Sequence, residues 1–378
     1  MNNRSRSSRP LTPNVDPAFL RASGEGTAGF QRRFADQTSS DFYRPTTFGL
    51  TISSIGLGTY LGEATKANDA AYEAAVGRAI TLGINLIDTA INYRNQRSEQ
   101  AVGAALQHVF ASGAAARQEL MVCSKGGYIP LDRNPPATRE EYRDYVKREF
   151  LDQQILRADE IVAGGHSLAP RFLRYCLAKS RQNLGLRTID TYYLHNPEQQ
   201  LGSVPRDEFM QRLRGAFAIL EEAALRGEIG VYGCATWEGL RVPPDHKFHV
   251  SLEVLVEIAR EVGGNGHHFR MVQLPVNLAM TEAVREATQS LDGKLVTPLQ
   301  AASELGLTVA ASATLMQAKL TSGLPDALRD PFPRATTDAQ RAIEFVRSMP
   351  GVTTTLVGMK RLDHVDENLG AVRLPRPT

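Results

Sequence analysis

From about residue 41 onward, short apolar runs alternate along the chain with longer amphipathic stretches. The short runs are rich in β-branched residues, which is typical of buried parallel strands, and the longer stretches repeat apolar residues at intervals of three and four, which is typical of helices. Several of the longer stretches end at a glycine, as helix C-termini often do. The predicted strands are residues 53–59, 84–90, 119–125, 190–196, 228–236, 271–277, 307–313 and 353–358.

Eight strand and helix units in one chain favour closure into a barrel, because closure removes both exposed edges of the sheet. The alternative is an open, doubly wound sheet that binds a dinucleotide at a GxGxxG turn after its first strand. The sequence GLG at 56–58 has too few glycines for that turn. We therefore predict an α/β fold, a (β/α)8 TIM barrel over residues 41–378.

Three segments fall outside the repeat. Residues 46–58 are predicted to form a hairpin that leads into the first strand and closes the bottom of the barrel. Residues 128–169 are too long for a simple loop and form an inserted segment after the third strand, with an expected helix at 142–156 lying over the mouth of the barrel. This segment is either a lid or a decoration without a catalytic part. Residues 1–40 are expected to be a disordered polar tail, although their Arg and Ser content also resembles a transit peptide.

Composition narrows the class of partner. The 43 Lys and Arg nearly balance the 41 Asp and Glu, so no large single-sign field indicates nucleic acid or an anionic membrane. No apolar run approaches the roughly 18 residues of a membrane span. The three cysteines have no CxxC or CxxH spacing, which argues against a disulfide framework and a metal site. We expect a soluble, cytoplasmic protein that acts on small molecules, as a monomer or small homo-oligomer.

Candidate chemistry lies at the ends of the predicted strands. Asp88 ends the second strand, Tyr93 follows it, Lys125 ends the third strand, and His195 ends the fourth. In a (β/α)8 barrel the C-terminal ends of the strands converge on one opening, where functional groups gather. The four side chains are therefore predicted to meet, although more than a hundred positions separate the first from the last.

The chemistry of these side chains fits a general acid facing a carbonyl oxygen. A tyrosine with a pKa near 10 donates a proton poorly at neutral pH unless a cation stabilises its phenolate, and Lys125 can supply that cation. Asp88 can hold a buried Lys125 charged, and His195 can orient a substrate oxygen. Each residue also has a non-catalytic explanation: Asp88 as a helix cap, Tyr93 as an aromatic at the rim, Lys125 as a solvated charge and His195 as a core histidine. Because this explanation requires four coincidences at one end of the barrel, we favour the catalytic interpretation.

Three motifs carry a family resemblance. The stretch GINLIDTAINYRNQRSEQAVGAAL at 83–106 resembles the signature of the aldo-keto reductase family, CSK at 123–125 resembles its lysine strand, and YYLHNP at 192–197 its histidine strand. The similarity runs from about Tyr43 to the C-terminus, interrupted by the insert. It implies an NADP(H)-dependent oxidoreductase that reduces aldehydes or ketones to alcohols by hydride transfer. Asp88, Tyr93, Lys125 and His195 would then be its catalytic tetrad, with Tyr93 as the general acid.

The resemblance also implies a set of cofactor contacts along the strand ends. It places a nicotinamide ribose beside the end of the first strand, a carboxamide near the fifth and sixth, a pyrophosphate under the loop after the seventh, and an adenine near 357–371. The implied contacts are Thr59, Tyr60, Asp88, Thr236, Gln273, Ser312, Leu315, Gly358, Lys360, His364, Glu367 and Asn368.

The sequence departs from the family pattern at three places. Ala235 and Thr236 stand where the family has Ser-Asn, so carboxamide binding would depend more on Thr236 and Gln273. Residues 94–97 lengthen the loop after the tyrosine and make it more basic. His364 stands where the family has its 2′-phosphate arginine, so NADP(H) would rely on Lys360, Arg361 or protonated His364, and NAD(H) stays an alternative.

Two other classes of function remain open from the sequence. One is a cofactor-binding regulatory or structural barrel with little turnover. The other is a lyase or isomerase in which Lys125 forms a Schiff base. The loops that would select a substrate cannot be interpreted from sequence patterns.

Overall fold

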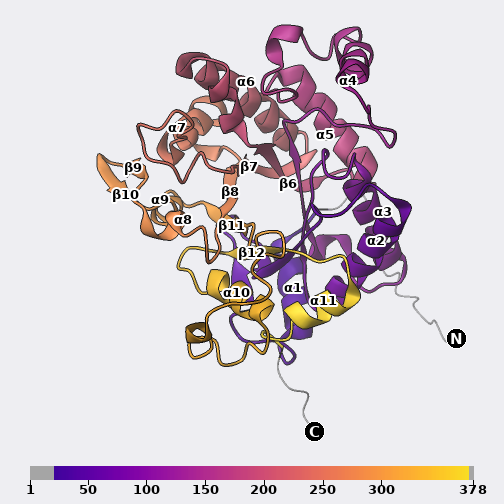
Figure 1. The fold of residues 1–378 in the computed structure, drawn as a ribbon, viewed down its shortest axis with the longest axis vertical. Coiled ribbons are helices and arrows are strands. Elements are labelled where there is room, and N and C mark those ends of the chain that lie inside the picture. The colour runs from indigo at the N-terminus through magenta and orange to yellow at the C-terminus, as the bar shows by residue number, and fades with distance from the viewer. Residues whose placement is uncertain (1–20, 374–378) are drawn as a thin grey trace, which may run out of the picture.

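The structure, a computed structural model, describes residues 21–373 and confirms the predicted barrel (Figure 1). All eight predicted strands are present, mostly with shorter bounds, and they close in the order β11-β12-β3-β4-β5-β6-β7-β8. Every neighbouring pair is parallel, so the C-terminal ends of the strands share one face. The strands are β3 (Ile55–Gly58), β4 (Leu86–Asp88), β5 (Met121–Gly126), β6 (Ile189–His195), β7 (Ile229–Ala235), β8 (Phe269–Pro275), β11 (Thr308–Ser312) and β12 (Thr354–Gly358).

Helices surround the strands, as Figure 1 shows. Their apolar faces and the outer faces of the strands form the larger hydrophobic cluster of the protein. Serine or threonine caps four of these helices by accepting a hydrogen bond from a backbone amide in the first turn, at Thr65, Ser251, Thr297 and Thr337. The helices are α2 (Lys66–Thr81), α3 (Arg97–Ala111), α5 (Pro170–Leu184), α6 (Arg206–Leu225), α7 (Leu252–Gly263), α8 (Glu282–Arg285), α9 (Pro298–Glu304), α10 (Asp338–Arg347) and α11 (Leu362–Asn368). A small antiparallel pair, β9 (Gln289–Leu291) and β10 (Lys294–Val296), precedes α9.

The predicted hairpin is formed by β1 (Tyr43–Pro45) and β2 (Thr51–Ser53), which pair antiparallel. Leu50 and Ile52 pack inside the barrel against Leu86 and Met121, the first residues of β4 and β5. Because those residues begin their strands, the hairpin closes the barrel at its N-terminal end, as predicted.

The expectation of a polar tail over residues 1–40 is wrong where α1 (Gly24–Phe34) forms. Ser23 caps this helix, and helical spacing places Thr27 and Phe30 on one buried face. The Phe30 ring packs against Phe34 and Tyr43, with ring centroids 4.9 and 6.5 Å away. The few apolar residues in a polar stretch were sufficient to anchor it. Residues 1–20 lie outside the described part of the chain.

The inserted segment after β5 contains a helix, but its bounds differ from the predicted 142–156. α4 (Arg139–Val146) starts earlier, and a turn of π-helix, Lys147–Leu151, continues it. Tyr145 and Phe150 pack against Phe172 and Cys176 of α5 in a separate hydrophobic cluster. The ends of the segment return to each other, because Tyr128 and His166 form an antiparallel bridge. The helix therefore lies on α5 while the base of the segment lies near the strand ends.

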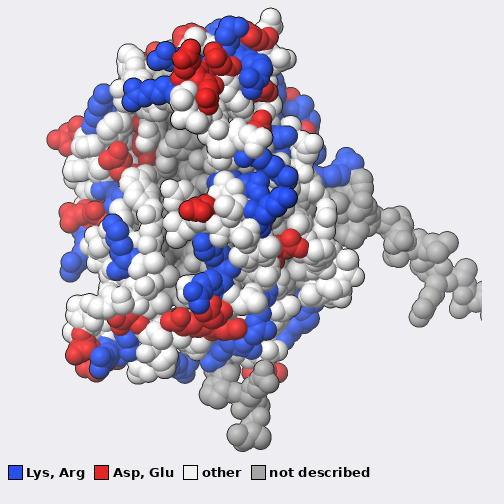
Figure 2. All heavy atoms as spheres, turned by 45° about the vertical axis from the view of Figure 1, so that its right-hand side comes forward, with Lys and Arg blue, Asp and Glu red and all other residues white. Residues whose placement is uncertain are grey.

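The surface carries both signs of charge interspersed over the face drawn in Figure 2, in keeping with the formal net charge of +2. Among the helices of residues 21–373, none combines the length and the apolar character that crossing a bilayer requires.

A buried ion pair joins the N-terminal ends of β5 and β6. Arg117 is fully buried, and its Nη2 lies 2.6 Å from Oδ2 of Asp190. The same carboxylate accepts the backbone amides of Val122 at 2.8 Å and Ala22 at 2.7 Å. Asp190 thus fastens both a strand and the segment before α1 to the bottom of the barrel.

Replacing Asp190 by Ala should lower the free energy of unfolding by about 3–5 kcal/mol, because Arg117 is left as an uncompensated buried charge. Urea unfolding followed by circular dichroism measures the change. Asp326→Ala, which removes the exposed pair between Asp326 and Arg329, is the matched control and should leave stability nearly unchanged. Equal effects of the two substitutions would contradict this account.

Candidate active site

The structure brings Asp88, Tyr93, Lys125 and His195 together at the C-terminal end of the barrel. Asp88 is the last residue of β4, Lys125 the next to last of β5, and His195 the last of β6. Tyr93 lies in the turn that follows β4. The predicted convergence therefore follows from the parallel order of three neighbouring strands.

An ion pair forms the centre of this cluster. The ammonium of Lys125 lies 2.6 Å from Oδ2 of Asp88 and donates to the carbonyl of Thr89 at 2.8 Å. The same nitrogen lies 5.0 Å from the centroid of the Tyr93 ring, and the ring of Tyr93 lies 5.7 Å from that of His195. A carboxylate, an ammonium, a phenol and an imidazole thus form one continuous group.

The loop after Tyr93 has an unusual backbone. Arg94, Asn95 and Gln96 all have positive φ angles, of 50, 57 and 67°, a conformation that non-glycine residues adopt rarely. Buried arginines hold it: Arg94 and Arg97 each reach a different oxygen of Asp69, at 2.6 and 2.7 Å. The longer, more basic loop noted in the sequence is therefore folded inward against α2, and its two arginines share one carboxylate.

The charges of the pair are set by burial and proximity. Burial opposes the charge of Lys125, but the neighbouring Asp88 outweighs this and raises the pKa of Lys125 above its ordinary value. Desolvation raises the pKa of Tyr93, and the Lys125 ammonium opposes that rise. Lys125 therefore stays protonated, and the Tyr93 hydroxyl keeps its proton at neutral pH with a cation beside it.

His195 is a neutral imidazole in this environment. Burial, followed by the charge of Lys125, holds the pKa of His195 well below its ordinary value. Its Nδ1 is buried and has no hydrogen-bond partner among the described residues. A neutral imidazole beside a phenol can donate a hydrogen bond to an oxygen without carrying charge.

The residues expected to contact a nicotinamide differ in whether their side chains are available to bind a ligand. Thr59 is fully buried, and its hydroxyl bonds to Thr89 at 2.9 Å, so this side chain is committed to the barrel wall. Tyr60 is 55% exposed, and its ring lies 5.0 Å from Tyr93. Gln273 donates to Oδ1 of Asp88 at 3.1 Å. The buried hydroxyl of Thr236 has no partner within the described chain, so it is free to bond a ligand.

The residues expected along the rest of the cofactor lie at the ends of β11 and β12. Ser312 ends β11, and the loop after it has positive φ at Ala313 and at 316–318. Gly358 ends β12. Leu315 is partly buried, His364 exposed, Glu367 partly buried and Asn368 buried. Ser312 and Gly358 thus end two consecutive strands beside β3, whereas His364, Glu367 and Asn368 lie in α11, which follows β12.

The cations near β12 have different partners. Lys360 bonds to the neutral amide of Asn68 at 3.1 Å. Arg361 is paired with the carboxylate of Asp363. Because its partner is neutral, Lys360 is more available than Arg361 to bind an anionic group of a ligand.

The sequence interpretation missed a buried carboxyl and a buried histidine. Glu198, which is 1% exposed, accepts the backbone amides of Trp237 and Glu238 on Oε1, at 2.6 and 3.2 Å. His166, from the inserted segment, donates to the main-chain oxygen of His195 at 2.8 Å. The signal for Glu198 is its place directly after the YYLHNP motif, whereas no local pattern marks His166.

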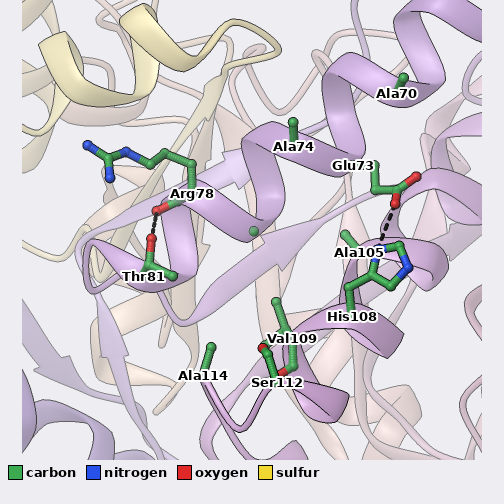
Figure 3. Close-up of a pocket in the computed structure, with 11 residues that line it drawn as sticks. Ala70, Glu73, Ala74, Arg78, Thr81, Ala105, His108, Val109, Ser112 and Ala114 are labelled. Atoms are coloured by element: carbon green, nitrogen blue, oxygen red, sulfur yellow. Dashed lines mark hydrogen bonds and ion pairs between the residues drawn. The ribbon is translucent and has the colours of Figure 1, made fainter.

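A groove of about 510 Å³ lies elsewhere, on the outside of the barrel between α2 and α3 (Figure 3). Its walls are mostly small side chains, and its charged residues are paired: Glu73 with His108 at 2.8 Å, and Arg78 with Asp366 at 2.7 Å. It contains none of the residues of the cluster at the strand ends.

Comparison with known proteins agrees with the fold and the motifs. The profile described as "Aldo/keto reductase family" matches residues 54–242. D-threo-aldose 1-dehydrogenase of a Pseudomonas species is 30% identical over 188 residues, 49% of this chain and 50% of that protein. A putative voltage-gated potassium channel subunit beta of Schizosaccharomyces pombe is 24% identical over 336 residues, 86% of each chain. The chain spans half, or less, of the length of several other curated relatives.

A solved structure shares the architecture. The aldo/keto reductase from Klebsiella pneumoniae in complex with NADP and acetate superposes with a TM-score of 0.58 at 19% identity, over 87% of this chain and 89% of that one. Together with the family match, which covers half of the sequence, the barrel and its motifs establish that this chain belongs to the aldo/keto reductase family.

Replacing Glu198 by Gln should remove a pH-dependent loss of stability. Burial raises the pKa of Glu198 to about 7, although backbone amides counteract the rise. The unfolded chain loses this proton first, near pH 4.3, so the wild type loses stability as pH rises from there to about 7. We expect the stability advantage of Glu198→Gln to grow by roughly 3 kcal/mol across this window and then to level off.

Urea unfolding of both proteins at pH 4.5, 6 and 8 measures this difference, and other titrating groups cancel because both chains share them. A constant difference between the two proteins would show that Glu198 does not titrate in this window.

Proposed function

We propose that this protein is an NADP(H)-dependent oxidoreductase that reduces an aldehyde or ketone to an alcohol. The observation that carries the proposal is the cluster of Tyr93, Lys125, Asp88 and His195, in which a protonated phenol lies beside a buried ammonium and a neutral imidazole. The names of the dehydrogenase and reductase relatives support the same reaction class.

The residues of the site fit a nicotinamide cofactor. The unpartnered hydroxyl of Thr236 would bond the carboxamide, with Gln273 beside it on the next strand. The loop after Ser312 and the segment 358–368 would hold the phosphates and the adenine, with Lys360 toward a 2′-phosphate. When bound, the cofactor supplies the hydride that reduces the carbonyl carbon.

The side chains of this protein would donate and position the proton that the substrate oxygen receives. Tyr93 donates its hydroxyl proton to the substrate oxygen, so one O–H bond breaks and another forms as the carbonyl becomes an alcohol. Lys125 stabilises the phenolate that remains, and Asp88 keeps that lysine charged. The neutral His195 donates a hydrogen bond that holds the substrate oxygen near the phenol. The same groups run the reverse oxidation when the phenolate accepts the proton.

Replacing Tyr93 by Phe should lower kcat for carbonyl reduction by about 100-fold or more, because a general acid contributes on that order, and should leave NADPH affinity nearly unchanged. Steady-state oxidation of NADPH with a panel of aldehydes, together with a fluorescence titration of NADPH, measures both quantities. Tyr175→Phe is the matched control, because it removes a phenol hydroxyl from a partly buried ring on α5 that packs against Phe150, away from the site. Retained turnover in Tyr93→Phe would remove Tyr93 from its role.

Lys360 should decide cofactor preference. A charge-assisted hydrogen bond to a 2′-phosphate contributes enough that Lys360→Ala should raise the Kd for NADPH about tenfold while leaving the Kd for NADH unchanged. Arg361→Ala, in which the lost cation was already paired with Asp363, is the control and should have a smaller effect. Tighter binding of NADH by the wild type would favour the NAD(H) alternative instead.

A second candidate is a cofactor-binding regulatory barrel with little turnover. The similarity to a potassium channel subunit over 86% of both chains favours keeping it. NADPH binding without steady-state turnover of any aldehyde would select this candidate. A Schiff-base mechanism on Lys125 is disfavoured, because Asp88 holds the lysine charged and an ammonium is not a nucleophile. A cytoplasmic location and a monomer or small homo-oligomer stay predictions.

A further inference from the structure

The two ends of the inserted segment meet against the last residue of β6. Gly127 precedes the segment, and its carbonyl accepts the amide of Ser167 at 2.7 Å. The Tyr128 ring lies edge-on between two imidazoles, 4.9 Å from His166 and 5.1 Å from His195. The base of the segment is therefore built around His195, while its helix lies on α5.

A chain of hydrogen bonds runs from α6 to the backbone of His195. Arg212 donates to Oε1 of Gln200 at 2.6 Å, and Nε2 of Gln200 lies 2.7 Å from Nδ1 of His166. Nε2 of His166 lies 2.8 Å from the main-chain oxygen of His195. Gln200 and His166 are both fully buried, so water does not compete for these bonds.

The groups at the two ends of this row of hydrogen bonds fix which atom donates and which accepts in each bond. A guanidinium only donates and a carbonyl oxygen only accepts. Arg212 therefore turns the Gln200 oxygen toward itself and the Gln200 amide toward His166, whose Nδ1 must accept. His166 is then a neutral imidazole with its proton on Nε2, directed at His195, and burial lowers its pKa to about 4, which agrees.

The residues after His195 depend on the same arrangement. Asn196 has a left-handed backbone, with φ of 49°, and its amide donates to the carbonyl of Ala235 at 2.6 Å. Its side chain donates to the hydroxyl of Tyr128 at 3.0 Å. At Gly127, which has φ of 144°, an added Cβ would lie 3.0 Å from both Nε2 of His166 and the oxygen of His195. The end of β6 is thus held from the inserted segment as well as from β7.

We propose that His166 is a positioning residue for the reaction: through its bond to the His195 carbonyl, the inserted segment sets the orientation of the His195 imidazole toward the substrate oxygen. This inference rests on the proposed carbonyl reduction and deepens it. The insert is then neither a lid nor a mere decoration, because its base supplies part of the support of the site.

The test compares two substitutions. His166→Leu keeps apolar bulk but removes the N–H donor, and we expect kcat for carbonyl reduction to fall about tenfold or more while the Kd for NADPH is unchanged, since small misplacements of catalytic groups are costly. His166→Gln retains an amide donor that reaches the same carbonyl and should restore kcat to within about threefold of the wild type. Thermal unfolding of each variant reports on folding.

A matched control removes a similar bond elsewhere. His249 is also buried, and its Nε2 lies 2.8 Å from the carbonyl of Thr288. His249→Leu should leave kcat unchanged even where it lowers thermal stability. Equal losses of kcat in His249→Leu and His166→Leu, or wild-type kcat in His166→Leu, would overturn the proposal.

A spectroscopic measurement separates this proposal from the proposed function. The ring ¹⁵N signals of His195, assigned with His195→Asn, should shift in His166→Leu and return in His166→Gln, whether or not the protein turns over an aldehyde. If the wild type reduces no carbonyl, the proposed function fails while this measurement still decides the role of His166. Unshifted His195 signals in His166→Leu would refute the positioning role.

Discussion

The buried pair of Lys125 and Asp88 is the interaction on which the candidate site depends. Two charges removed from water are costly, and the cost is offset only where geometry and further hydrogen bonds are favourable. Here the carboxylate bonds the ammonium on one oxygen and Gln273 on the other, and the ammonium also bonds the Thr89 carbonyl. The pair itself joins the neighbouring strands β4 and β5, but Gln273 reaches Asp88 from β8, four strands away, so this supporting hydrogen bond forms only in the closed barrel.

The two ends of the barrel use buried charge for different purposes. At the N-terminal end, Arg117 and Asp190 fasten strands and the segment before α1, and the hairpin β1–β2 covers the interior. At the C-terminal end, the charges of Lys125 and Asp88 lie beside Tyr93, which is partly exposed. The buried charges at the N-terminal end therefore stabilise the fold, whereas those at the C-terminal end lie among groups suited to chemistry, as expected of this architecture.

The inserted segment has an apolar part that stabilises it and a polar base that contacts the site. Its apolar residues pack on α5, and the cost of ordering such a long excursion is offset by burying Tyr145 and Phe150. Its base, however, is polar and bonded to the end of β6 through His166. Segments added to a barrel at this face can therefore influence a site without covering it.

The sequence alone determined the eight strands, their parallel order and the four residues of the cluster, because hydrophobic periodicity and strand ends are local signals. It also determined the hairpin, whose residues alternate toward the barrel interior. The sequence did not reveal α1, since Phe30 finds its partners in Phe34 and the distant Tyr43. Nor did it reveal His166, whose role depends on Gln200 and Arg212. Those features were decided by tertiary structure, because the free energy of each comes from contacts between segments that only the closed barrel brings together.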